Sequence, residues 1–391
     1  MSEFKWDPAW RDRRLAVACT DVQAGVVGAV REVLAETREA RDFARRGYAS
    51  ALLGSLAASG NLPKLWLREE PRSPDALLLA ARVAAVHAAG AYRHQPYLLP
   101  KLVQQAVDLT VAAGRAWNED PTPYVVMLGL TKLHRTGAPV EPRAAELGGL
   151  LGPWDLVEQG VWARDRFNRE AGRQLLAYFS PEYGGGNEPM SRVAAYLADT
   201  SPPASPLRLL PMAAFLDRAP DPVADADDDR QHDDRVSAAR RLLAEIDGQL
   251  ASPAVLGGGH RADGTSVADP EDLRARRERL VRIVDEREGE RWSEPGVVRR
   301  PLARGLVQVY VQWFLTPGVL EPVGAAGYVP LPDMSLLARG LHLAGEFTYA
   351  RHVLRHLLPF ASRYPWSLAG DPEAVLRSVL HDCEVSVTWL A

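Results

Sequence analysis

The chain has 391 residues, of which 47% are hydrophobic and 25% are charged, and its formal net charge is −4. This composition is that of a folded globular protein rather than a disordered one, and the length allows one large hydrophobic core or two ordinary ones. The slightly acidic charge excludes an overall attraction to nucleic acid or to an anionic membrane surface, so we expect neither partner.

Cysteine usage and hydropathy favour a reducing compartment. The sequence contains Cys19 and Cys383 and no Cys-x-x-Cys spacing, so it indicates neither a disulfide framework nor a thiolate metal site. The first residues lack the apolar core of a secretory signal, and there is no run of about 18 apolar residues that could span a bilayer. We therefore expect a cytoplasmic protein without a membrane partner.

A recurring Ser-Pro, Thr-Pro or Asp-Pro pair marks the starts of several predicted helices. The first residue of each pair can accept a hydrogen bond from an N–H group of the first helical turn, and proline at the first helical position has no N–H to leave unpaired. The pairs are Ser73-Pro74, Thr122-Pro123, Ser205-Pro206, Asp269-Pro270 and Asp371-Pro372. They predict a chain of helices.

The N-terminal half shows apolar residues at helical spacing, interrupted by short turns. An irregular arm over residues 1–14 is followed by a predicted amphipathic helix over 21–36. Further helices are predicted over 40–59, 75–92, 96–117, 124–134, 142–151, 154–163, 164–179, 188–198 and 205–216. Turns this short place consecutive helices antiparallel.

The composition changes at residue 219, where prolines and then a run of aspartates begin. A like-charge block without apolar residues is typical of a solvated linker, so we predict a helical domain over 1–218, an acidic linker over 219–234 and a C-terminal helical domain over 235–391. The helices predicted in the last domain cover 235–250, 271–292, 301–315, 335–343, 347–361 and 371–389. The expected fold is all-α, an array of antiparallel helical hairpins like a tetratricopeptide solenoid, with a C-terminal helical bundle.

A family resemblance covers residues 61–217. Its segments are LPKLWLREEPRSPDALLLAARVAAVHA, EDPTPYVVMLGL, ARDRFNREAGRQLLAYFSPEYGG and PPASPLRLLPMAAFL. They resemble an uncharacterised, largely actinobacterial domain-of-unknown-function family with tetratricopeptide-like helix pairs. The resemblance implies a curved helical array with a binding role and supplies no catalytic residues.

Two motifs could carry chemistry. Residues 225–229 include an Asp-x-Asp-Asp sequence that resembles the proton-donating motif of class II terpene cyclases, but a catalytic acid needs an apolar pocket and this run lies among other acids. His352 and His356, spaced i,i+4, could share a metal with Glu346, but neighbouring arginines would repel a cation. We therefore predict no metal and no cofactor.

Aromatic and arginine side chains are the better candidates for a binding surface, because binding energy concentrates in such residues. The candidates are Tyr183 beside a triple glycine, Tyr328 in a long loop over 316–333, and Arg339, Arg351 and Arg355, which could hold an anion or an acidic peptide. The sequence thus favours a cytoplasmic helical-repeat scaffold that accepts a peptide or protein partner on its concave face. The alternative is an enzyme of specialised metabolism, for example terpene-cyclase-like, with a pocket between its two halves; the oligomeric state is left open.

Overall fold

The fold is all-helical over the residues that the structure, a computed structural model, describes: 4–134, 152–218, 300–315 and 328–385, together with Ile246, Arg274 and Arg277. No β-strand occurs in these ranges, where Lys5 and Phe360 form an isolated β-bridge. The α-helices are α1 (Arg13–Ala24), α2 (Gly28–Glu39), α3 (Phe43–Ala57), α4 (Leu62–Glu69), α5 (Pro74–His94), α6 (Leu99–Ala116), α7 (Thr122–His134), α8 (Pro153–Asp155), α9 (Arg169–Tyr178), α10 (Asn187–Thr200), α11 (Leu210–Leu216), α15 (Arg300–Tyr310), α16 (Leu331–Leu343), α17 (Phe347–Leu357) and α18 (Pro372–Asp382). Helix α8 continues as a π-helix over Leu156–Trp162, and α15 continues as one over Val311–Leu315.

Side-chain caps start the helices much as the sequence predicts. The Ser73 hydroxyl accepts a hydrogen bond from the Ala76 N–H at 3.3 Å, and Asp371 caps α18 through the Ala374 N–H at 2.9 Å. At α7 the cap is different, because the Thr122 N–H donates to the Asp120 carboxylate at 2.8 Å. Some predicted elements lie outside the described residues, apart from Ile246, Arg274 and Arg277. They are the helix start at Asp269-Pro270 and the helices over 142–151, 235–250 and 271–292.

The first predicted helix, over 21–36, is wrong, because the chain forms two helices there. Gly25 adopts a left-handed conformation with φ 73° and ends α1. Its N–H donates to the Val22 carbonyl at 3.1 Å, and the Val26 N–H donates to the Asp21 carbonyl at 2.8 Å. Glycine takes this conformation without the steric penalty that a side chain would bring, so the helix ends here and α2 begins three residues later.

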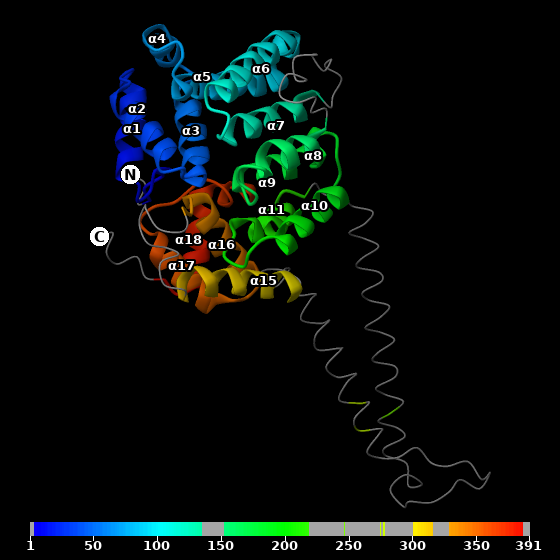
Figure 1. Cartoon of the computed structure of the whole chain (residues 1–391). Helices are drawn as coiled ribbons and strands as arrows, with labels where there is room; N and C mark the ends of the chain where they lie inside the picture. The colour runs from blue at the N-terminus through cyan, green and yellow to red at the C-terminus, as the bar shows by residue number, and fades with distance from the viewer. Residues whose placement is uncertain are drawn as a thin grey trace, which may run out of the picture. The chain divides into compact units, whose positions relative to one another are not determined.

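Helix α5 organises the core of the N-terminal half. It is 21 residues long and packs against α3, α4, α6 and α7. Figure 1 shows α5 and α6 side by side as a hairpin. Leu79 of α5 belongs to the same buried apolar cluster as Leu53 of α3 and Trp66 of α4, with Leu53 and Trp66 fully excluded from solvent. The many alanines of α5 let the neighbouring helices approach closely.

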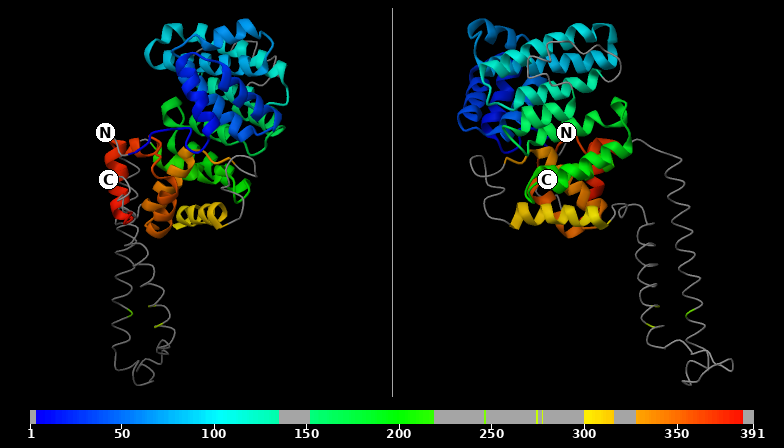
Figure 2. Two further views of the ribbon diagram at one scale, coloured as in Figure 1. Left: turned by 90° about the vertical axis from the view of Figure 1, so that its left-hand side faces the viewer. Right: turned by 45° about the vertical axis from the view of Figure 1, so that its right-hand side comes forward.

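The chain divides into two units, one comprising Met1–Arg218, Arg304–His342 and Glu346–Ala391 and the other Ala219–Ala303 and Leu343–Gly345. This grouping differs from the predicted separation of residues 1–218 from 235–391. Within the first unit, α16 packs against α11, where a Cβ at Gly340 would lie 3.1 Å from the Met212 side chain. Helices α16, α17 and α18 lie at the opposite end of this unit from α4 and α6 (Figure 2). The predicted acidic linker over 219–234 lies outside the described residues.

Buried polar contacts explain why the C-terminal helices join the N-terminal ones. Asp333, 1% exposed on α16, pairs with Arg169 and Arg173 of α9. The Trp313 indole N–H donates to the Ala204 carbonyl at 2.9 Å. Such buried pairs fix two segments relative to each other because separating them would leave charges unpaired.

The N-terminal arm is tied to the segment after α17. The Lys5 N–H donates to the Pro359 carbonyl, and the Lys5 carbonyl accepts from the Ala361 N–H, both at 2.9 Å. Arg11 adds a side-chain bond to the His356 carbonyl at 3.0 Å. The first and last parts of the unit therefore meet around the start of α1.

None of the described helices is both long enough and apolar enough to cross a bilayer.

Candidate functional site

Of the two tyrosines that the sequence singles out, Tyr183 is buried and Tyr328 is half-buried, and they do not share a surface. Tyr183 is 5% exposed, with its ring stacked on Tyr92 at a centroid distance of 5.6 Å and the Lys132 Nζ over it at 4.9 Å. Tyr328 packs against Tyr48 with ring centroids 5.8 Å apart. Burial raises the pKa of the Tyr328 phenol well above its ordinary value, and the nearby Asp12 carboxylate raises it further.

The three predicted arginines differ in how open they are. The Arg351 Nε donates to the Cys383 carbonyl at 2.6 Å, and its Nη2 pairs with Glu384 at 2.7 Å, so this side chain holds the end of α18. Arg339 contacts the His342 imidazole, whereas Arg355 is exposed on α17. These arginines serve different local contacts, and the structure does not gather them with Tyr183 and Tyr328 into one site.

The histidines of the C-terminal helices have neighbours of their own. His342 uses both ring nitrogens, with Nδ1 3.1 Å from Arg339 and Nε2 2.9 Å from the Asp382 carboxylate. His352 places Nδ1 2.6 Å from the Tyr310 hydroxyl. No group of three or more His, Cys, Asp or Glu side chains in the described part of the chain could hold a metal ion, and the Asp-rich motif at 225–229 falls outside that part.

A pocket of about 750 Å³ opens at the start of α1. This volume falls within the ordinary range of ligand sites, about 300–1,000 Å³. The walls come from the N-terminal arm, α1, α2, α3 and the segment after α17. The lining residues are Trp10, Arg11, Asp12, Arg13, Arg14, Glu36, Arg45 and Phe360. Four arginines thus face two carboxylates around one cavity with two aromatic rings.

Arg45 is the innermost of these arginines and is already neutralised. It is 2% exposed, and its guanidinium bonds both oxygens of Asp12, at 2.7 and 3.0 Å, and reaches Glu36 at 3.2 Å. Burial alone would lower the pKa of Arg45, but the two carboxylates outweigh that effect and raise it. Arg45 therefore builds the wall of the pocket and stays charged there.

The outer arginines are more open. Arg14 pairs with Glu36 at 2.7 Å with 69% of its side chain exposed. Arg11 lies over the Trp10 ring, 5.0 Å from its centroid, and partial burial lowers its pKa. Arg13 is exposed at the first position of α1 and has no ion pair with any described residue. The pocket therefore carries positive charge that its own carboxylates do not neutralise.

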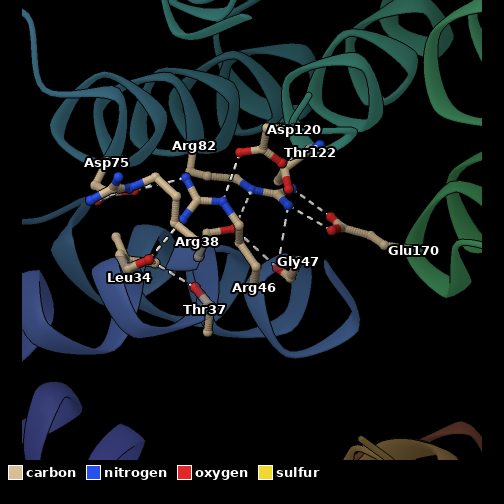
Figure 3. Close-up of polar contacts among 11 residues, drawn as sticks. Leu34, Thr37, Arg38, Arg46, Gly47, Asp75, Arg82, Asp120, Thr122 and Glu170 are labelled. Carbon is tan, nitrogen blue, oxygen red and sulfur yellow. Dashed lines mark hydrogen bonds and ion pairs between the residues drawn. The ribbon is translucent and has the colours of Figure 1, made fainter. Parts of the chain in front are cut away.

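A buried polar network next to the pocket fixes the helix that carries Arg45. Arg46, the next residue on α3, is fully buried, and its Nε donates to Asp120 at 2.7 Å while Nη1 donates to the Leu34 carbonyl at 2.9 Å. Its Nη2 forms an ion pair with Asp75 at 2.8 Å, although not with hydrogen-bond geometry. Figure 3 shows these groups meeting between α3, α5 and the turn before α7.

A second arginine of this network extends it to α9. Arg82 of α5 pairs with the Glu170 carboxylate, with oxygens at 2.5 and 2.6 Å, and also donates to Ser50 and to the Gly47 carbonyl (Figure 3). Each guanidinium thus bridges α3 to another helix. Because a buried charge without a partner is costly, these bonds hold α3 in one position and orientation.

The sequence predicts an irregular arm over residues 1–14 but does not predict the pocket. The available signal was the run Trp10-Arg11-Asp12-Arg13-Arg14, which combines an aromatic residue with three arginines within five positions. Comparison of the chain with protein-family models, with curated proteins and with solved structures finds no match.

Proposed function

We propose that the protein is a helical scaffold that binds a peptide or protein partner, and that the pocket at the start of α1 is where the partner attaches. The observation that carries this proposal is the cavity of about 750 Å³ lined by four arginines, Trp10 and Phe360. Arginine and tryptophan are the residues most enriched among those that dominate binding energy at protein interfaces.

The rest of the unit suits such a role. Several consecutive helices pack against each other, and α5 and α6 form the clearest hairpin (Figure 1). We infer from this pairing a tetratricopeptide-like arrangement and membership of the actinobacterial family that the sequence resembles. Arrays of this kind present extended surfaces to partners. The proposal includes a cytoplasmic location, consistent with the two cysteines being unpaired.

The buried network contributes a rigid support for the pocket. The ion pairs of Arg46 and Arg82 hold α3 against α5 and α9, so Arg45 and its partners keep their places before any ligand arrives. A preformed site spends less of its binding energy on ordering its own side chains. No observation on the described residues favours the alternative of a terpene-cyclase-like enzyme.

Site-specific photo-crosslinking in the native cell tests the proposal. A benzophenone amino acid replaces Arg14 at the pocket or, as the matched control, Arg192, which is equally exposed on α10. We expect a discrete protein adduct from position 14 and none from position 192. Absence of an adduct from position 14, or the same adducts from both positions, would refute attachment at the pocket.

A further inference from the structure

We infer that the pocket at the start of α1 recognises an acidic peptide segment, through Arg11 and Arg13. This inference rests on the proposed function, since it names the chemistry of the partner that the pocket would take. Four arginines line the cavity, and they differ in how many hydrogen-bond donors they have left for a ligand.

Two of the four are committed to carboxylates of the chain itself. Arg45 bonds Asp12 and Glu36, and Arg14 bonds the same Glu36. These two arginines and two carboxylates balance one another. The remaining charge of the lining comes from Arg11 and Arg13, and neither forms an ion pair with a carboxylate in the described part of the chain.

Arg11 is held in place for recognition. One of its nitrogens, Nη2, donates to the His356 carbonyl at 3.0 Å, and its guanidinium lies over the Trp10 ring. A guanidinium has five N–H donors, so several remain after this bond. A carbonyl partner leaves the positive charge uncompensated, whereas a carboxylate ligand would compensate it and accept two parallel hydrogen bonds.

Arg13 supplies a second positive group one helical position beyond Asp12. Its exposure and its place in the lining leave it able to meet a second carboxylate of the same ligand. The rings of Trp10 and Phe360 lie in the same lining and offer apolar surface. A peptide with acidic residues on both sides of an apolar one matches this combination of two cations and two rings, whereas a small inorganic anion would use only the cations.

Peptide binding to the full-length protein tests the inference. The probe is a fluorescein-labelled peptide, Gly-Glu-Glu-Phe-Glu-Glu-Gly, and its control has glutamine in place of every glutamate; binding is followed by fluorescence anisotropy at low salt. We expect the acidic peptide to bind, the glutamine peptide to bind at least tenfold more weakly, and binding to weaken as NaCl is raised.

Variants locate the binding to the pocket. Arg11→Ala and Arg13→Ala should each weaken the acidic peptide by about tenfold or more, because each removes a charge-assisted bond. Arg192→Ala, an exposed arginine on α10, should leave affinity unchanged. Circular dichroism melts confirm that each variant is folded before its affinity is compared.

The peptide-binding and crosslinking experiments distinguish failure of the acidic-peptide inference from failure of the proposed function. Three results would overturn the acidic-peptide assignment. They are equal affinity for the acidic and glutamine peptides, unchanged affinity in both pocket variants, and full displacement of the acidic peptide by millimolar inorganic phosphate. If a pocket adduct still forms in the crosslinking experiment, partner binding at the pocket stands and only the acidic chemistry fails. If both experiments fail, the proposed function fails with it.

Discussion

Replacing Arg46 with methionine is the most direct test of the buried network that supports the pocket. The substitution keeps a long side chain but removes the guanidinium that bonds Asp120, Asp75 and the Leu34 carbonyl. Asp75 keeps an ion pair with Arg38 at 3.1 Å. Asp120 keeps only its bond from the Thr122 N–H among the described residues, so one buried carboxylate loses its counter-charge.

The size of the effect follows from burial. Arg46 is fully buried and Asp120 is 2% exposed, and removing one partner of a buried ion pair costs about 3–5 kcal/mol of unfolding free energy. The matched control is Arg31→Met. It removes ion pairs to Glu70 at 2.7 Å and to Glu69 at 3.6 Å, and all three side chains are at least 39% exposed. A surface pair of this kind contributes about 1 kcal/mol or less.

Urea denaturation at pH 7, followed by circular dichroism, compares the two variants with the parent protein. A second variant, Arg46→Met combined with Asp120→Asn, removes the unpaired carboxylate while keeping an oxygen for the Thr122 N–H. We expect it to recover part of the lost stability. If Arg46→Met costs no more than Arg31→Met, or if the double variant is less stable than the single one, the network does not act through paired buried charge.

Three further changes probe the packing and the C-terminal contacts. Gly54→Ala should reduce the unfolding free energy by about 1–3 kcal/mol, because the added Cβ would lie 2.5 Å from the Cβ of Arg82. Gly90→Ala on α5 is the control, since its added Cβ would meet nothing within 4 Å, and it should not destabilise the protein. Thermal melts compare the two variants. Asp333→Asn should reduce the unfolding free energy by about 3 kcal/mol or more at pH 7, measured by urea denaturation. Burial would raise the pKa of the Asp333 carboxyl, but its two arginine partners outweigh burial and lower it. The stability that this carboxylate contributes is therefore present at neutral pH and is lost in acid, so the substitution should cost less below about pH 4. Arg351→Glu should reduce the unfolding free energy by about 1 kcal/mol and so lower the melting temperature, because it loses the bonds to the end of α18. Arg355→Glu, at an exposed arginine one turn later, should change neither.

Local chemistry explains what the sequence could predict. The caps at Ser73 and Asp371 depend on residues within three positions of each other, so a short segment contains the whole signal. The all-helical class follows from apolar spacing in the same way. The split at Gly25 was missed because a single left-handed residue ends a helix without interrupting its apolar spacing.

The candidate site depends on contacts that no local pattern contains. Arg46 meets Asp120, 74 positions away, and Arg11 meets the His356 carbonyl, 345 positions away. Adjacent arginines such as Arg45 and Arg46 are expected at a surface, because arginine is buried only when paired and its partners cannot be identified from spacing. Tyr183 shows the same dependence, since the neighbouring glycines made it a binding candidate, but the contacts of its ring with Tyr92 and Lys132 come from residues far away in the sequence.

His356 gives a pH-dependent test of the contact between the N-terminal arm and α17. Its ring lies between Trp10 and Phe314, at centroid distances of 6.0 and 5.2 Å. Burial, and then the positive charge of Arg11, lower the pKa of His356 from 6.5 to about 4. Between these two pH values the unfolded chain binds a proton that the folded protein does not, so this stability is fully present above pH 6.5 and is lost progressively down to pH 4.

Replacing His356 with phenylalanine keeps a ring between its aromatic neighbours and removes the titrating group. We expect the urea midpoint of this variant to vary less with pH across the interval from 6.5 to 4 than that of the parent protein. His381→Gln, at an exposed histidine on α18, is the control and should keep the parent profile. An unchanged profile in His356→Phe would mean that other groups control the acid sensitivity. A flattened profile would show that the imidazole is buried uncharged where the N-terminal arm meets α17, which is the contact that shapes the pocket.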